Sequence, residues 1–154
     1  MKPEKYLFIV RHAHRDTTNK MLDNGLSEKG RGQSKKIRDS LSRELGEDQV
    51  IILSSPKARC IETLEPLAEA LGIEIEIDPK LDEHGPSETT ASFRERTKIF
   101  AEFIGKKKFH RMVICSHGDW IPEFTAFILG KGIDLEKAGM IELRYFSKAW
   151  HLNG

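Results

Sequence analysis

Short apolar runs alternate with longer amphipathic segments along most of this chain. The runs at 7–10, 50–53 and 112–115 are too short for buried helices and rich in strand-favouring residues, so they predict buried strands. Residues 73–77 alternate apolar and acidic side chains, which predicts a half-exposed strand, and 140–146 predicts a last strand. Segments of helical periodicity separate these runs. The order predicts a three-layer α/β fold, in which helices cover both faces of a mostly parallel central sheet.

Start and stop signals bound the predicted helices. Ser27 is expected to cap the first helix. Ser55 as N-cap, with Pro56 at the first helical position, predicts the start of the second. The third helix is predicted over 92–103, and a fourth follows the strand at 112–115. Four apolar side chains of the third helical segment are expected to point inward: Phe93, Phe100, Phe103 and Ile104.

Basic and imidazole side chains stand where the first strand ends. The sequence there is Arg11-His12-Ala13-His14-Arg15. Crowding these groups together is unfavourable unless an anion lies among them. The end of a strand is also where an open α/β sheet usually places its ligand site. The stretch therefore predicts a site for a phosphate or carboxylate group.

Two further strands end in residues of the same chemistry. Ser54-Ser55-Pro56 follows the second strand and places Arg59 in the next helix, and Ser116-His117-Gly118 follows the strand at 112–115. Parallel strands point their carboxyl ends the same way, so these groups are expected to meet at one rim. Arginines suit phosphoryl oxygens, an imidazole can attack phosphorus, and a helix N-terminus near Gly118 adds backbone donors.

Composition limits the alternatives. The 154 residues fit one domain, 1–154, and the net charge of +1 argues against nucleic-acid binding, as does the placing of Lys106–Lys108 at a helix end. No apolar run is long enough for a membrane span, and the N-terminus leaves no room for a signal peptide, so a cytoplasmic protein is expected. Cys60 and Cys115 are interpreted as buried thiols and form neither a disulfide framework nor a zinc site.

Five ordered segments resemble the histidine phosphatase superfamily, also called phosphoglycerate mutase-like, from residue 7 to about residue 130. Arg11-His12-Ala13 is similar to its Arg-His-Gly/Ala motif, and 26–33 to its Leu-Ser/Thr-x-x-Gly-x-x-Gln segment. Residues 54–63 match Ser-Ser-Pro-x-x-Arg-x-x-x-Thr, Leu81-Asp82-Glu83 matches Leu-x-Glu, and Ser116-His117-Gly118 matches Ser/Gly-His-Gly. The resemblance implies the phosphoglycerate mutase-like fold.

The resemblance also implies a role for each matching residue. His12 would be the phosphorylated nucleophile, Arg11 and Arg59 would hold the phosphoryl oxygens, and His117 would complete that pocket. Glu83 would donate a proton to the leaving group. No metal or cofactor is implied. The expected activity is hydrolysis of a phosphomonoester, with a phosphorylated small molecule or a phosphoprotein as substrate.

Departures from the family pattern keep alternatives open. Ala13-His14-Arg15 replaces Gly-Glu-Thr, and Arg15 is interpreted as a contact to substrate or phosphate. His14 could share a face with His12, but no third metal ligand is evident. The loop 78–90 is short, so no large cap insertion and an open pocket are expected. The chain thus also resembles the compact phosphohistidine phosphatase (SixA-like) branch, in which an imidazole leaving group has less need of Glu83. A phosphate-binding module without turnover is the third alternative, and the oligomeric state stays open.

Overall fold

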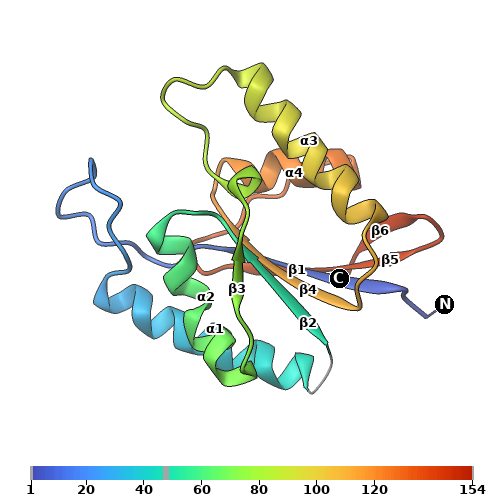
Figure 1. Ribbon diagram of the computed structural model, residues 1–154, viewed down its shortest axis with the longest axis horizontal. Coiled ribbons are helices and arrows are strands. Elements are labelled where there is room, and N and C mark those ends of the chain that lie inside the picture. The colour runs from blue at the N-terminus through green and yellow to red at the C-terminus, as the bar shows by residue number, and fades with distance from the viewer. Residues whose placement is uncertain (1, 47–48, 154) are drawn as a thin grey trace.

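A six-stranded sheet forms the centre of the protein in the computed structural model, which describes residues 2–46 and 49–153 (Figure 1). The strands are β1 (Lys5–Arg11), β2 (Val50–Ser54), β3 (Ile75–Ile77), β4 (Arg111–Ser116), β5 (Met140–Phe146) and β6 (Ala149–Leu152). Their order across the sheet is β3-β2-β4-β1-β5-β6. The first four run parallel, whereas β5 is antiparallel to β1 and β6 to β5. A mostly parallel sheet is therefore confirmed.

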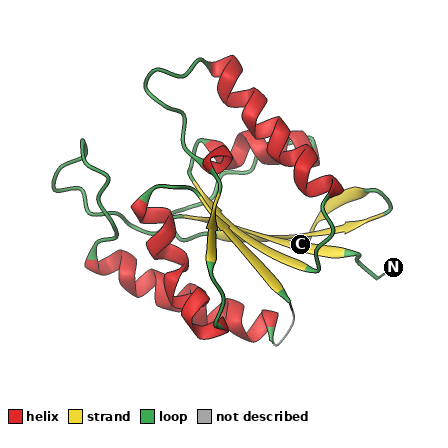
Figure 2. Cartoon of the chain, viewed as in Figure 1, coloured by secondary structure: helices red, strands yellow, loops and turns green. Residues whose placement is uncertain are grey.

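Two pairs of helices cover the two faces of the sheet (Figures 1 and 2). Helices α1 (Glu28–Leu45) and α2 (Ala58–Leu71) lie on one side, and α3 (Thr90–Lys106) and α4 (Trp120–Leu129) on the other. A short 3₁₀ helix, η1 (Pro79–Leu81), follows β3. Side chains of β1 alternate between the two cores, because successive residues of a strand point to opposite faces. Leu7 and Ile9 pack with α3 and α4, and Phe8 and Val10 pack with α1 and α2. This is the predicted three-layer arrangement.

The start of α2 differs from the prediction. Ser27 does cap α1 by accepting from Gly30 N, but Lys57, not Ser55, is the N-cap of α2, and Pro56 precedes the helix. The first amide of α2, Ala58 N, instead donates to the carboxylate of Asp23 at 3.0 and 3.2 Å. Ser55 Oγ lies 2.8 Å from a nitrogen of His117, so its hydroxyl contacts a predicted site residue at the rim of the sheet.

Three other expectations need correction. The strand predicted over 73–77 begins only at Ile75, because Ile73 N still donates to Ala68 O in the C-terminal turn of α2. Phe103 is 42% exposed, since the buried stripe of α3 runs through Phe93, Thr97, Phe100 and Ile104 and leaves Phe103 at its margin. Strand β6 was not anticipated. It returns from β5 through Ser147-Lys148, both with positive φ, as in the two-residue turns of twisted hairpins.

The topology brings distant segments to one rim. Arg11, at the end of β1, pairs with Ser116 at the end of β4, and Ser54 at the end of β2 pairs with Cys115. Because β5 is antiparallel to β1, its first residue, Met140, pairs with Val10. The segment that precedes β5 therefore reaches the same rim as the carboxyl ends of the parallel strands. None of the described helices is long and apolar enough to cross a membrane.

Candidate active site

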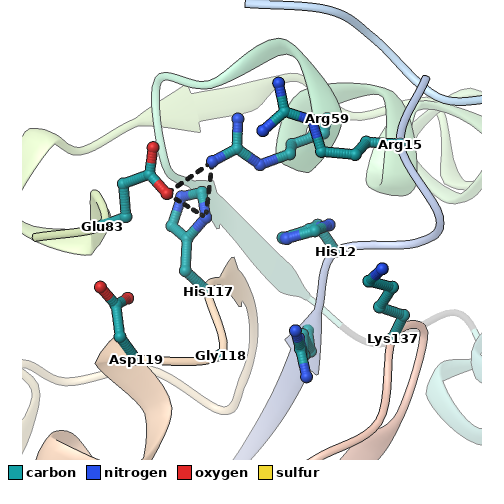
Figure 3. A pocket seen from close by; sticks show the side chains of 9 residues that line it. His12, Arg15, Arg59, Glu83, His117, Gly118, Asp119 and Lys137 are labelled. Atoms are coloured by element: carbon teal, nitrogen blue, oxygen red, sulfur yellow. Dashed lines mark hydrogen bonds and ion pairs between the residues drawn. The ribbon is translucent and has the colours of Figure 1, made fainter. Parts of the chain in front are cut away.

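A cavity of about 460 Å³ opens at the carboxyl ends of the parallel strands (Figure 3). Nine residues line it: Arg11, His12, Arg15, Arg59, Glu83, His117, Gly118, Asp119 and Lys137. The structure thus brings together all seven of the residues proposed from the sequence. Asp119 and Lys137 were not foreseen.

His12 presents one ring nitrogen to this cavity with its lone pair free. Its Nδ1 lies 2.8 Å from Ala13 O, and since a carbonyl oxygen only accepts, Nδ1 carries the proton. Burial lowers the pKa of His12 to about 4, and the charges of Arg59, Arg11 and Lys137 act in the same direction. The imidazole is therefore neutral near pH 7, with Nε2 unprotonated, which is the state that a nucleophile requires.

Side chains of α1 and α2 fix the backbone that follows His12. Thr63 Oγ1 accepts from Ala13 N at 2.9 Å, and Gln33 Oε1 accepts from His14 N at 2.8 Å. His14 turns away from the cavity, and its Nδ1 lies 2.7 Å from Ser27 Oγ. His14 and His12 do not share a site. Across the described ranges, no group of three or more His, Cys, Asp or Glu side chains gathers to hold a metal ion.

Arg59 lines the cavity with only 3% of its side chain exposed. One terminal nitrogen is 2.7 Å from Glu83 Oε2, and the other is 4.0 Å from Asp23 Oδ1. Its Nε is buried and has no hydrogen-bond partner. A buried donor without a partner is costly, so this guanidinium is suited to an anion that would satisfy it.

The guanidinium of Arg11 lies directly against Gly118. A Cβ at position 118 would lie 2.7 Å from Arg11 Cζ, so a larger residue there would displace this guanidinium from its present position. Arg11 NH1 donates to Leu135 O at 2.8 Å, while its Nε is a second buried donor that lacks a partner. Arg11 and Arg59, which the sequence predicted to bind the phosphoryl group together, are thus both held in place, and each has one buried nitrogen without a hydrogen-bond partner.

His117 lies beside His12, with ring centroids 5.4 Å apart. Burial lowers the pKa of His117 to about 2, and the neighbouring charges of Arg59 and His12 add to the effect. The imidazole is therefore neutral, and its Nε2 lies 2.8 Å from Ser55 Oγ. It supplies a polar wall to the cavity without adding a positive charge.

The side chain of Glu83 is 38% exposed, whereas those of Arg59 and His117 are each 3% exposed. Hydrogen bonds with Arg96 of α3 and Asp119, the N-cap of α4, hold the loop of Glu83 in place. Arg96 donates to Asp82 O at 2.8 Å and to Glu83 O at 2.7 Å, and Asp119 Oδ2 accepts from His84 N at 3.0 Å. The carboxylate contacts Arg59 and lies within 4.0 Å of His117. Glu83 thus faces His12 across the cavity from a braced loop (Figure 3).

Comparison with known proteins agrees with this geometry. The model of the histidine phosphatase superfamily (branch 1) matches residues 7–86, more than half of the chain. The chain belongs to this superfamily. That match ends just after Glu83, and so it covers the sequence that supplies Arg11, His12 and Arg59. No curated protein matches the sequence significantly.

Solved structures share the fold of this histidine phosphatase superfamily member over nearly its whole length. Mycobacterial glucosyl-3-phosphoglycerate phosphatase superposes with a TM-score of 0.76 at 20% identity, covering 97% of each chain. A putative α-ribazole-5′-P phosphatase from Escherichia coli K-12 gives 0.84 at 14% identity, covering 97% of this chain and 95% of that one. Phosphoserine phosphatase from Entamoeba histolytica gives 0.77 at 16%, with the same coverage. At these identities the likeness establishes the fold.

Proposed function

We propose that this protein is a phosphatase that hydrolyses phosphomonoesters through a phosphohistidine formed on His12. The observation that carries the proposal is the state of His12, whose Nε2 is unprotonated and faces a cavity walled by arginines. Nucleophilic catalysis needs such a group next to a site that stabilises the reacting phosphoryl group. Two partly unsatisfied guanidiniums, from Arg11 and Arg59, provide that stabilisation.

The proposed reaction has two steps. In the first, the lone pair of His12 Nε2 attacks phosphorus, the ester P–O bond breaks, and the leaving oxygen takes a proton from the carboxyl group of Glu83. In the second, water attacks the same phosphorus and gives a proton to the Glu83 carboxylate, and the P–N bond breaks to release inorganic phosphate. Arg11, Arg59 and His117 hold the phosphoryl oxygens through both steps.

Glu83 is the proposed acid because of its position. It lies on the far side of the cavity from His12, where an in-line displacement places the leaving oxygen (Figure 3). The names of three structural neighbours describe phosphatases of small phosphorylated molecules, which supports the same class of substrate here.

One contact favours a second candidate, a protein phosphohistidine phosphatase. Glu83 pairs with Arg59 at 2.7 Å, so its carboxyl group already has a partner and is not free to serve a leaving oxygen. Phosphohistidine has an imidazole leaving group that needs less help from an acid. The need for Glu83 therefore distinguishes the two functions.

Replacement of His12 tests the proposal first. We expect His12→Ala to abolish hydrolysis of an alkyl phosphate and of an aryl phosphate while the circular dichroism spectrum stays unchanged. When turnover is stopped by denaturing the protein at alkaline pH, the wild type should carry an alkali-stable phosphate, as expected of a phosphohistidine, and His12→Ala should carry none. A folded His12→Ala variant with full activity would refute the proposed mechanism.

Glu83→Gln separates the two candidate functions. For a phosphomonoesterase, the variant should lose about 10²- to 10⁴-fold on an alkyl phosphate, which is the usual contribution of general acid catalysis. It should lose much less on an aryl phosphate, whose leaving group departs without a proton. If wild type hydrolyses only phosphohistidine, and Glu83→Gln hardly changes that rate, the second candidate is correct. Binding of phosphate without any turnover would leave only a binding module.

A further inference from the structure

One carboxylate of the cavity has no part in the proposed reaction. Asp119 lines the cavity and follows directly after His117 and Gly118, between the end of β4 and the start of α4. Its charge has the same sign as that of a phosphate ester and therefore opposes substrate binding. A carboxylate beside a phosphoryl site thus indicates a second contribution that offsets this repulsion.

The side chain of Asp119 does not serve its own helix. Asp119 is the N-cap residue of α4, where aspartate is favoured because its carboxylate can accept from the amides of the first turn, yet it forms no such bond. Its backbone is helical, at φ −90° and ψ −32°, whereas Ser27 and Thr89, which do cap their helices, have extended backbones. Oδ2 of Asp119 instead accepts from His84 N at 3.0 Å. The carboxylate is therefore directed at the loop that carries Glu83.

One oxygen of this carboxylate is left over. Asp119 is exposed, and within residues 2–46 and 49–153 its Oδ1 accepts no hydrogen bond and its carboxylate forms no salt bridge. Glu83, in contrast, already contacts Arg59 at 2.7 Å. The bond between Oδ2 and His84 N holds the Asp119 carboxylate in place, so Oδ1 can accept from a molecule bound in the cavity.

Asp119 lies on the side of the cavity where the second proposed step begins. In Figure 3, Glu83 and Asp119 lie on the same side of the two histidines. Water that displaces His12 in line must approach phosphorus from the side opposite to the P–N bond, which is the side of these two carboxylates. They stay together because His84, next to Glu83 in sequence, is hydrogen-bonded to Asp119.

An attacking water molecule offers two O–H groups. Its lone pair forms the new O–P bond while the P–N bond breaks, and one proton passes to Glu83, as in the proposed reaction. The other hydrogen stays on the oxygen that becomes part of inorganic phosphate, and during the attack it needs an acceptor. Asp119 Oδ1 is a free acceptor on that side. Two acceptors orient the water so that its lone pair points at phosphorus.

We infer that Asp119 binds the second O–H of the attacking water and thereby makes water, rather than an alcohol, the acceptor of the phosphoryl group. The inference rests on the proposed function, since it concerns the breakdown of the phosphohistidine. An alcohol has only one O–H, which Glu83 would take, and its carbon would occupy the place of the O–H that Asp119 binds. Contact with carbon leaves the carboxylate without a partner, which disfavours the alcohol.

The variant Asp119→Asn separates this role from the support of the Glu83 loop. Its amide oxygen can still accept from His84 N, but its amino group stands in place of Oδ1 and cannot accept. With an aryl phosphate, formation of the phosphohistidine should stay within about threefold of wild type, because that step uses no water. Hydrolysis of the phosphohistidine should slow about 10- to 100-fold, as loss of orientation allows. Rapid-quench measurement of the released aryl alcohol and of the phosphohistidine gives both rates.

Added methanol supplies the second measurement, the early ratio of methyl phosphate to inorganic phosphate. Methanol needs Glu83 but not Asp119, so Asp119→Asn should raise this ratio about 10- to 100-fold over wild type. Glu83→Gln should slow both transfers and leave the ratio near that of wild type. Asp39→Asn is the matched control, since Asp39 on α1 is 62% exposed and does not line the cavity. It should change neither the ratio nor the rates.

The ratio and the phosphohistidine together decide the outcome. An unchanged ratio in Asp119→Asn overturns the inference even if hydrolysis slows, because an effect through the Glu83 loop would lower both transfers equally. The proposed function survives that result as long as wild type forms a phosphohistidine. If wild type forms none, the proposed function is refuted and the inference falls with it. A raised ratio with normal formation of the phosphohistidine supports both.

Discussion

Arg96 holds the loop that carries the proposed acid, and its replacement offers a sharp test of how that acid works. Its guanidinium donates to three backbone oxygens, Lys80 O, Asp82 O and Glu83 O, at 2.7 to 3.0 Å. It also contacts both carboxylate oxygens of Glu88, at 2.7 and 3.0 Å. The perturbation is Arg96→Met, which keeps the bulk of the stem and removes every donor.

The structure sets the size of the expected effects. Lys80 O keeps a second donor, Trp120 Nε1 at 2.7 Å, so only Asp82 O, Glu83 O and the Glu88 carboxylate lose a partner. Hydrogen bonds with one charged partner contribute about 1.5–3 kcal/mol each, and water can replace part of that at a side chain 19% exposed. We expect the free energy of unfolding to fall by about 2–3 kcal/mol, well short of the sum.

Activity should fall in a way that depends on the leaving group. A displacement of about 1 Å can cost roughly 10²-fold in rate, so hydrolysis of an alkyl phosphate should fall about 10- to 100-fold as Glu83 loses its fixed position. An aryl phosphate, whose leaving group needs no proton, should lose less than about threefold. Both rates are measured on the same preparation, with thermal unfolding recorded alongside.

Arg94→Met is the matched control for this experiment. Arg94 lies on the same helix, is 61% exposed and pairs with Glu123 at 3.3 Å, so its loss should cost less than about 1 kcal/mol and leave both activities unchanged. If Arg96→Met lowered the alkyl and aryl activities by the same factor, Arg96 would not act through Glu83 and the reasoning would be wrong.

Three further predictions concern the same site. Gly118→Ala should reduce kcat/KM about tenfold or more, because its Cβ displaces the Arg11 guanidinium, whereas Gly32→Ala, whose Cβ meets nothing, should leave activity unchanged. The imidazole of His12, followed by NMR, should stay neutral down to about pH 5, and bound phosphate should raise its pKa. Between pH 6.5 and about 4 the unfolded chain binds the extra proton at this histidine, so stability should fall as pH falls through that range. The salt bridge to Arg96 lowers the pKa of Glu88 to about 2, so its contribution should be lost as pH falls from about 4.5 to about 2, a loss that an acid-unfolding curve of Glu88→Gln should lack.

The sequence was most informative where local chemistry decides the structure. Apolar runs predicted β1, β2 and β4, and the residues after each run predicted which side chains would meet at the rim, because parallel strands share a direction. Where a side chain serves a distant partner, local rules failed. Ser55 resembled a helix cap, but its hydroxyl lies against His117, and the carboxylate of Asp23, far away in sequence, caps α2 instead.

Lys137 shows what a motif search cannot supply. It lies in a polar stretch between α4 and β5 that matches no segment of the family, and only the antiparallel pairing of β5 with β1 carries it to His12. Strand direction depends on tertiary packing, which the pattern 140–146 does not encode. The role of Arg96 could not be predicted for the same reason. An arginine on a helix is ordinarily solvated, and no local pattern reveals the carbonyl groups to which Arg96 donates.

The position of Arg59 connects substrate binding to the proposed proton transfer. One guanidinium serves two anions, since it contacts Glu83 at 2.7 Å and also lines the phosphoryl site. A bound phosphoryl dianion would compete for the same donors and so weaken the contact between Arg59 and Glu83. In the proposed reaction the substrate therefore frees Glu83 to meet the leaving oxygen, and phosphohistidine, which hardly requires an acid, would not depend on this exchange.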